Sequence, residues 1–253
     1  MIEFTNVTKS FPGIDRPAVD DVSFFIEAGE TVVLLGSSGC GKSTTLRLIN
    51  RILDPDAGEI LVRGKPNTER PLLQLRRSIG YVIQNVGLFP HWTIEENVAA
   101  PLRISGVSPA ERRTRSRRLL ELVELDPEEF AGRYPDELSG GQQQRVGVAR
   151  ALVGDPDILL MDEPFGALDG VTRESLQQET RRLNEELGKT ILLVTHDLFE
   201  ALALGDRIGV MHEGRLEQVG TKSDLLNHPA TPFVRELFGK PARQLELYRE
   251  SRS

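Results

Sequence analysis

Short apolar runs alternate along the chain with segments that have the spacing of amphipathic helices. Residues 1–7 alternate between apolar and polar side chains, as an amphipathic strand does, whereas the later apolar runs are short and continuous. Short continuous runs are typical of strands that are buried on both faces. In chain order, expected strands lie at 31–35, 157–161 and 190–195, and helical patterns lie at 43–51 and 171–187. Strands that alternate with helices predict an α/β fold with a mainly parallel sheet.

The central part of the chain has a different pattern. From about residue 93 to 125 there is no strand pattern, and charged, helix-forming sequence is broken at Pro101 and Pro109. We interpret this part as a helical insertion between two parts of one α/β core. The expected domain covers residues 1–240, with the core at 1–87 and 155–240, the helical subdomain at about 88–154, and a short polar tail at 241–253.

Composition narrows the class of protein without identifying it. Hydrophobic residues make up 39% and charged residues 27% of the chain, which is ordinary for a globular protein. The apolar runs are far shorter than the roughly 18 residues of a membrane-spanning helix, and residues 1–7 lack the pattern of a secretory signal. The single cysteine, Cys40, fits a reducing compartment and excludes a cysteine metal cluster. We therefore expect a cytoplasmic protein.

Charge argues against a nucleic-acid partner. The formal net charge is −7, which gives no electrostatic support for binding a phosphate backbone. The exception is a dense group of arginines at Arg112, Arg113, Arg115, Arg117 and Arg118. This group is either a binding patch or the solvated face of a helix, and we favour the second interpretation.

A glycine-rich loop follows the expected strand at 31–35. The loop and the residues after it are Gly36, Ser37, Ser38, Gly39, Cys40, Gly41, Lys42, Ser43 and Thr44. They match the phosphate-binding motif G-x-x-x-x-G-K-[ST], and the strand before them and the helix after them give the context that this motif requires. In such loops backbone N–H groups and a helix N-terminus face phosphate oxygens. We expect Lys42 to bridge the β- and γ-phosphates of ATP and the Ser43 hydroxyl to bind Mg²⁺.

Cys40 lies at a variable position of this motif. In one interpretation, the helix N-terminus and Lys42 favour its thiolate, which predicts that alkylation inactivates the protein and that ATP protects it. In the other, a small residue merely fits the loop.

Two carboxylates, Asp162 and Glu163, follow the apolar run that precedes them. Alone they would be ordinary solvated acids at the end of a strand. Beside a phosphate-binding loop, we expect Asp162 to hold Mg²⁺ through water and Glu163 to polarise the water that attacks the γ-phosphate.

The segment Leu138-Ser139-Gly140-Gly141-Gln142, followed by Gln143-Gln144-Arg145, resembles the signature of the ABC family of ATPases. A serine and two glycines at the start of a helix form a second anion site, with no phosphate of its own to bind. The resemblance implies a phosphate-loop (RecA-like) core with an N-terminal antiparallel β part and an inserted helical subdomain. It also implies a head-to-tail dimer, either a homodimer or a pair with a second ATPase subunit. In that dimer the residues contacting the ATP of the opposite subunit are Ser139, Gly140, Gly141, Gln142 and Asp169.

Further family elements follow in order along the chain. Phe11 resembles the aromatic residue that stacks on adenine, where the family more often has tyrosine. Gln84 resembles the glutamine that joins the Mg²⁺ shell, and His196 resembles the histidine that contacts the γ-phosphate. Taken alone, Gln84 and His196 would more often be polar caps at strand ends. Together with Glu163 they are the catalytic residues that the resemblance implies.

The segment from Asp162 to Asp169 resembles the importer form of the family, rather than that of exporters, envelope machines or ABC proteins without a transport role. Residues 79–84, 87–91 and 93–98 are most similar to ATPases of osmoprotectant uptake, which carry quaternary amines such as glycine betaine, choline or carnitine. Importers of amino acids or other small solutes are the alternative. The implied partners are an integral-membrane permease and, indirectly, an extracytoplasmic solute-binding protein, with the ATPase on the inner face of the membrane. The ATPase does not touch the cargo, so no residue here encodes its choice.

An apolar turn lies beside Gln84. Leu88, Phe89 and Trp92 form either a docking surface for a permease helix or local packing under the helical insertion, and the sequence leaves both open.

Overall fold

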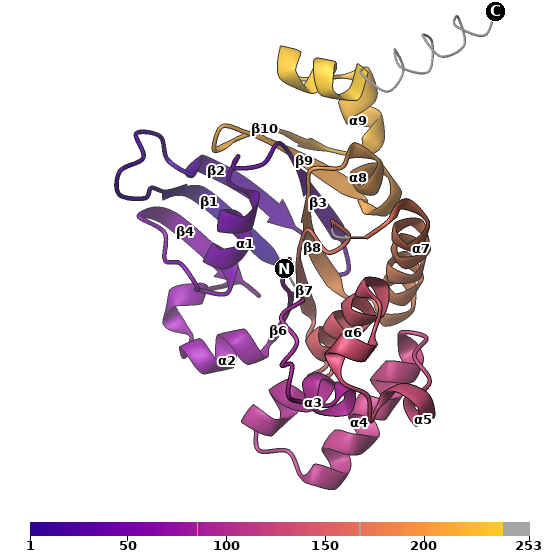
Figure 1. Ribbon diagram of the computed structural model, residues 1–253. Helices are drawn as coiled ribbons and strands as arrows, with labels where there is room; N and C mark the ends of the chain where they lie inside the picture. Colours follow the sequence, from indigo (N-terminus) through magenta and orange to yellow (C-terminus); the bar gives the residue numbers. More distant parts are fainter. Residues whose placement is uncertain (85, 167, 240–253) are drawn as a thin grey trace, which may run out of the picture.

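The computed structural model describes residues 1–84, 86–166 and 168–239, and its strands fall into two sheets (Figure 1). The strands are β1 (Ile2–Lys9), β2 (Val19–Ile26), β3 (Thr31–Leu35), β4 (Ala57–Val62), β5 (Lys65–Pro66), β6 (Ile79–Val82), β7 (Ile158–Asp162), β8 (Thr190–Thr195), β9 (Arg207–His212) and β10 (Arg215–Gly220). The helices are α1 (Lys42–Ile49), α2 (Leu72–Arg77), α3 (Ile94–Ile104), α4 (Pro109–Leu122), α5 (Pro127–Phe130), α6 (Gly140–Leu152), α7 (Gly170–Leu187), α8 (Leu198–Leu204) and α9 (Lys222–Asn227), with 3-10 turns at Asn67–Glu69 and Pro135–Glu137. This arrangement confirms the predicted α/β fold.

The larger sheet has the strand order β10-β9-β3-β8-β7-β6. Its strands pair in parallel except β10, which runs antiparallel to β9. Every residue of β3, β7 and β8 is buried, and this is why these strands have continuous apolar sequences. Residues that follow parallel strands emerge at one edge of the sheet, where ligands bind in such folds. Gly36, Glu163 and His196 are therefore brought to the same edge.

The smaller sheet, β2-β1-β4-β5, is antiparallel, as the family resemblance implied. Its inner face packs with α1 and one face of the larger sheet into one buried cluster, to which Phe4, Phe24, Leu46 and Leu34 belong. The rings of Phe4 and Phe24 stack at 4.7 Å. α1 is thus fixed by apolar packing on both sides, which holds its N-terminus still at the sheet edge.

The part of the chain from α3 to α6 is helical, and Figure 1 shows α3, α4 and α5 grouped at the end of the molecule opposite β10. The predicted break at Pro101 is wrong, because Pro101 lies inside α3. A proline inside a helix loses one hydrogen bond and crowds the preceding turn, but buried Val98 and Leu102 hold α3 in the core. Pro109 instead occupies the first turn of α4, after the cap Ser108, where its missing N–H costs nothing.

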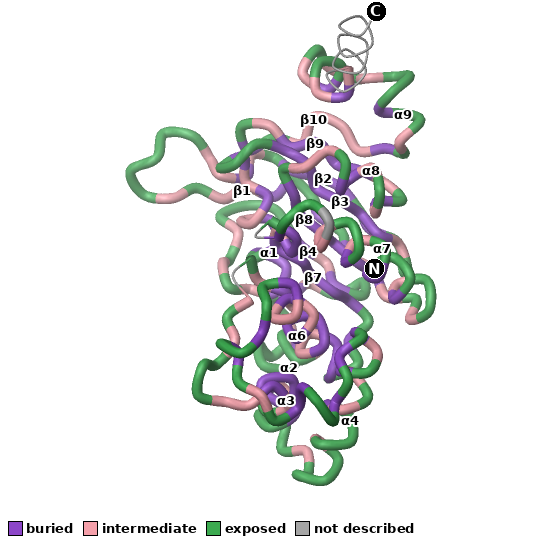
Figure 2. Tube along the Cα trace, turned by 45° about the vertical axis from the view of Figure 1, so that its right-hand side comes forward, coloured by how far each residue is buried: buried purple, intermediate pink, exposed green. Residues whose placement is uncertain are grey.

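Most of α4 is exposed (Figure 2), and of its arginine group Arg113, Arg115 and Arg118 are exposed while Arg112 and Arg117 are half-buried, in agreement with the favoured interpretation. Arg115 pairs with Glu111 one turn away, and the Nε of Arg117 lies 3.0 Å from a carboxylate oxygen of Glu95 on α3. The first contact lies within α4, and the second joins α4 to α3. In the described ranges no helix has the length and apolar character needed to cross a membrane.

Candidate nucleotide-binding site

The phosphate-binding loop runs from the buried end of β3 to the start of α1. Gly41 precedes α1 with φ of 106°, and no side chain caps the helix. A Cβ at Gly41 would lie 2.1 Å from the carbonyl oxygen of Ala18, and one at Gly36 would lie 2.3 Å from that of Met211, whereas one at Gly39 would meet nothing within 4 Å. The loop is therefore wedged between neighbouring backbones at both ends. Uncapped N–H groups in the first turn of α1 can accept an anion.

Lys42 is buried and its side chain folds back over the loop. Its ammonium donates to the carbonyl oxygens of Gly36 at 2.8 Å and Ser37 at 2.9 Å. A buried positive charge that has only neutral acceptors favours a negatively charged partner. The geometry thus agrees with the phosphate contact that we expect for Lys42.

Ser43 and Asp162 lie side by side although they are far apart in the sequence. The Ser43 hydroxyl donates to a carboxylate oxygen of Asp162 at 2.6 Å, and this carboxylate is almost fully buried. The Tyr81 hydroxyl lies 3.3 Å from the other oxygen, and burial raises the pKa of Tyr81, so it stays a donor. A hydroxyl and a carboxylate held together are the hard oxygen ligands that Mg²⁺ prefers. The residues present fit this ion.

Glu163 is the centre of a second cluster at the same edge. Its backbone is in the left-handed region, with φ of 44°, and its N–H donates to the carbonyl oxygen of Val194 at 3.0 Å. Gln84 donates to one carboxylate oxygen at 3.0 Å, and the Nδ1 of His196 lies 3.3 Å from the same oxygen. The structure therefore brings together all three residues predicted to be catalytic. A strained backbone at such a position is typical of functional sites.

The signature segment begins a different helix. Ser139 caps α6 by accepting from the N–H of Gln142 at 3.3 Å, and the Gln142 side chain accepts from the N–H of Ser139 at 2.9 Å. Ser139 and Gly140 are exposed, while Gly141 is buried against Thr172. An exposed serine hydroxyl that already accepts a bond still has its proton to donate.

Two predicted contact residues lie outside these clusters. Phe11 is half-buried in the loop between β1 and β2, and no described contact joins it to the phosphate-binding loop. Asp169 is exposed, and its side chain accepts from the N–H of Thr172 at 3.1 Å. Ala167, the side chain of Val171 and the predicted tail at 241–253 lie outside the described residues.

The structure disfavours the first interpretation of Cys40, that of a thiolate. The side chain is 3% exposed, and burial raises the pKa of the thiol more than nearby Lys42 lowers it. Desolvation therefore outweighs the positive charge. The structure favours the other interpretation, that a small residue merely fits the loop.

In the apolar turn after Gln84, one residue agrees with local packing and another with a docking surface. Leu88 packs partly buried against the core, whereas Phe89 is 47% exposed and its ring lies 4.6 Å from the Trp92 ring, tilted by 37°. Phe89 also borders a groove of about 680 Å³ between α2, β6 and α3.

Two side chains that the sequence analysis missed hold this turn in place. Asn97, buried in α3, accepts from the N–H of Phe89 at 2.7 Å and donates to the carbonyl oxygens of Phe89 and Trp92, both at 3.1 Å. Arg150 donates to the carbonyl oxygens of Val86 and Gly87. Asn97 could have been found, because a polar residue on the apolar face of a helix needs partners.

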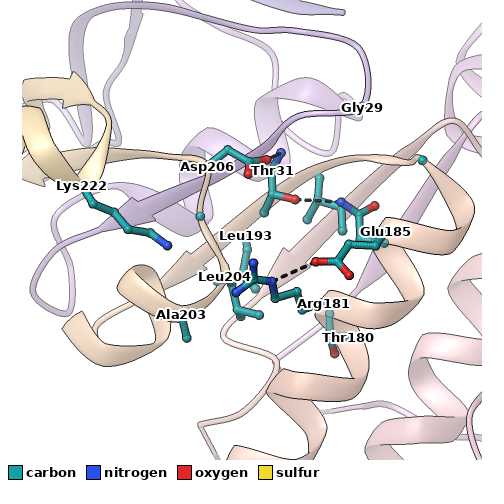
Figure 3. A pocket seen from close by; sticks show the side chains of 14 residues that line it. Gly29, Thr31, Thr180, Arg181, Glu185, Leu193, Ala203, Leu204, Asp206 and Lys222 are labelled. Carbon is teal, nitrogen blue, oxygen red and sulfur yellow. Dashed lines mark hydrogen bonds and ion pairs between the residues drawn. The ribbon is translucent and has the colours of Figure 1, made fainter.

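A separate pocket of about 300 Å³ lies at the opposite edge of the larger sheet (Figure 3). Thr31 at the start of β3, Asn184 of α7, Asp206 and Lys222 line it, and Asn184 donates to the Thr31 hydroxyl at 2.9 Å. None of the predicted site residues belongs to this pocket.

A phosphate-binding loop between a buried strand and a helix, with two carboxylates after a neighbouring strand, defines a phosphate-loop nucleotide-binding protein. Within that class the chain belongs to the ABC transporter family, whose model matches residues 19–166. The family resemblance and the fold predicted from it are thereby confirmed.

Curated relatives come from uptake systems. The choline transport ATP-binding protein OpuBA of Bacillus subtilis (strain 168) is 48% identical over 95% of this chain and 62% of its own length. The glycine betaine uptake system ATP-binding protein YehX of Escherichia coli (strain K12) is 49% identical over 95% of this chain and 77% of its own. The spermidine/putrescine import ATP-binding protein PotA of Nitrosomonas europaea is also 48% identical, over 95% of this chain and 65% of its own. The chain spans less than two thirds of the length of the first of these relatives.

A solved structure has the same fold. The ATP-binding cassette MJ0796, a dimer in a post-hydrolysis state bound to ADP and Pi, superposes with a TM-score of 0.79 at 40% identity, covering 87% of this chain and 98% of that chain.

Proposed function

We propose that this chain is the ATP-hydrolysing subunit of an ABC importer and that it binds Mg-ATP at a head-to-tail dimer interface. One observation carries the proposal. Lys42, Ser43, Asp162, Glu163, His196 and Gln84, which come from four separate segments, meet at one edge of the sheet.

Each residue has a proposed role. The uncapped turn of α1 and Lys42 bind the phosphates, and Phe11 stacks on the adenine. Ser43, Asp162 and Gln84 would hold Mg²⁺, which supplies charge neutralisation at the β- and γ-phosphates. Glu163 accepts a proton from the attacking water, and His196 donates to the γ-phosphate. Gln84 and His196, both on one oxygen of Glu163, leave its other oxygen for the water.

The second half of each site comes from the partner subunit. Exposed Ser139 has a proton to donate to the γ-phosphate of the opposite ATP, with Gly140, Gly141 and Gln142 offering the helix N-terminus and Asp169 contacting the same interface. The dimeric state of MJ0796 supports this arrangement. Two bound ATP molecules then stabilise the closed dimer, and hydrolysis removes that preference.

The deciding experiment compares wild type with Glu163→Gln. We expect the variant to lose at least about 100-fold in kcat, because its amide cannot accept the proton, and to accumulate as an ATP-bound dimer in light scattering. Glu185→Gln, an exposed change on α7, is the control and should match wild type. Normal hydrolysis by monomeric Glu163→Gln would refute the catalytic assignment.

The cargo is proposed from the relatives. We propose uptake of a quaternary-amine osmoprotectant such as glycine betaine or choline, through a permease supplied by a solute-binding protein, with this chain on the cytoplasmic face. The equal identity to PotA keeps another small-solute importer, here one of polyamines, as the second candidate. In a strain that lacks this chain, two losses are compared: growth rescue by betaine at high salt and uptake of polyamines. Loss of the first supports the osmoprotectant, and loss of the second supports the polyamine.

Exposed Phe89 and its groove are our proposed docking site for a permease helix. Phe89→Asp should abolish uptake while the isolated subunit still hydrolyses ATP. Loss of both activities would mean that Phe89 belongs to the core.

A further inference from the structure

Arg173, in the first turns of α7, contacts two other segments of the site: the loop before α7 and the start of α8. It donates to the carbonyl oxygen of Leu168 at 3.0 Å and to a carboxylate oxygen of Asp197 at 3.2 Å, and its Nε lies 4.0 Å from Glu200. The planar guanidinium can hold several acceptors in one fixed geometry, which a lysine cannot do.

The contact with Asp197 holds the segment that carries His196. Asp197 uses one carboxylate oxygen to cap α8, accepting from the N–H of Phe199 at 2.8 Å, and the other to accept from Arg173. Asp197 follows His196 directly, so Arg173 fixes the backbone that presents the imidazole to Glu163.

The other contact controls the loop before α7. Leu168 precedes Asp169, and a Cβ on Gly140 would touch the Leu168 side chain at 3.9 Å. A Cβ on Gly141 would lie 2.6 Å from the Thr172 methyl group, beside Arg173 in the sequence. The start of the signature helix therefore rests on the same turn of α7.

We propose that Arg173 is a positioning residue that couples the two nucleotide sites of the dimer. The inference rests on the proposed function: His196 serves the chain's own ATP, whereas Ser139 and Asp169 serve the ATP of the opposite subunit. Because Arg173 joins both groups within one chain, closure of the signature on one ATP shifts the histidine at the other. Coupling of this kind appears as cooperativity in ATP.

A purely structural role is the competing explanation. Glu200 is 3% exposed, and its burial raises its pKa. Arg173 is one of the groups that offset this burial, so removal of Arg173 could simply destabilise the fold. Glu200→Gln removes the buried charge, and the effect of Arg173→Gln in that background is then free of an unpaired carboxylate.

The experiment measures steady-state hydrolysis against ATP concentration for the purified chain, with fluorescent-nucleotide affinity and unfolding midpoints beside it. We expect Arg173→Gln, alone and with Glu200→Gln, to bind nucleotide within about twofold of the matching background, to lose about tenfold in kcat and to show a Hill coefficient near one. Arg173→Lys should fall between, since an ammonium reaches one acceptor at a time. Arg181→Gln, on an exposed face of the same helix, is the control and should keep the wild-type Hill coefficient.

An unchanged kcat and Hill coefficient in the Arg173→Gln, Glu200→Gln chain would overturn the coupling role while the wild type still hydrolyses ATP. If the Glu163→Gln variant hydrolyses ATP as fast as the wild type, the proposed function itself is overturned.

Discussion

Two helices of this chain begin where we expect phosphate groups, and they begin in opposite ways. α1 follows Gly41 and has no side-chain cap, so its first N–H groups are available to an anion. α6 follows Ser139 and closes a full capping box with Gln142, so the hydroxyl proton of Ser139 is the donor that remains. The difference suggests a division of labour, in which α1 supplies binding energy and α6 senses that ATP is present.

The largest effect should come from the α1 side. Lys42→Ala removes the buried ammonium, and we expect nucleotide affinity to fall about 100-fold, or roughly 2.7 kcal/mol. Fluorescent-nucleotide titration measures it, with Lys189→Ala, which removes a surface pair with Asp155, as the control. Affinity within threefold of wild type would contradict the claim that the α1 side supplies the binding energy.

The α6 side should respond in rate instead of affinity. Ser139→Ala is expected to lower kcat about tenfold and leave the affinity of the monomer unchanged, because the lost proton acts only in the dimer. The change also removes a cap that contributes about 1 kcal/mol. Thr221→Ala is a matched control, since Thr221 caps α9 with the same box. Equal losses of ATPase activity in both variants would show that only the cap mattered.

A smaller effect should follow from crowding behind the signature. Gly141→Ala places a Cβ 2.6 Å from the Thr172 methyl group, which we expect to cost about 1–3 kcal/mol of unfolding free energy. Thr172→Ser removes that methyl group and should restore most of the loss. Denaturant unfolding measures both, and Gly154→Ala, which meets nothing within 4 Å, is the control. No recovery in the double variant would exclude this contact as the cause.

The free energy of unfolding should change gradually with pH. Arg145 of α6 lies 2.9 Å from Glu179 of α7, and burial raises the pKa of Glu179 from 4.5 to about 7 despite this attraction. Between these values the folded chain holds a proton that the unfolded chain has lost. Unfolding free energy should therefore fall as pH rises from about 4.5 to 7, by up to roughly 3 kcal/mol.

Glu179→Gln tests this dependence by denaturant unfolding across that range. The variant should flatten the slope, and an unchanged slope would assign it to other groups.

The sequence predicted the parts of the site that depend on local pattern. Apolar continuity placed β3 and β8 at their observed bounds, whereas β7 is shifted by one residue at each end, and its later end includes Asp162 because this residue still pairs with Val194 of β8. Motif spacing placed Lys42 and Ser43, since a strand, a loop and a helix are contiguous in the chain.

Features that depend on packing could not be predicted in this way. The pKa of Cys40 depends on how deeply the loop is buried, and Pro101 is tolerated because distant side chains hold α3. The junction at Arg173 joins residues separated by 24 positions, and no local pattern indicates it.

The three glycines of the phosphate-binding loop are under different constraints. Gly36 and Gly41 are pressed against the carbonyl groups of Met211 and Ala18, so a side chain at either position disturbs the folded chain before any nucleotide arrives. A Cβ at Gly39 would meet nothing, so a substitution there causes no clash and costs only the backbone strain of its φ of 79°. A descendant of this protein that had lost ATP hydrolysis but kept its shape would therefore tolerate replacement of the third glycine more readily than of the first two. The order in which these glycines are replaced would show whether such a lineage lost catalysis or the fold first.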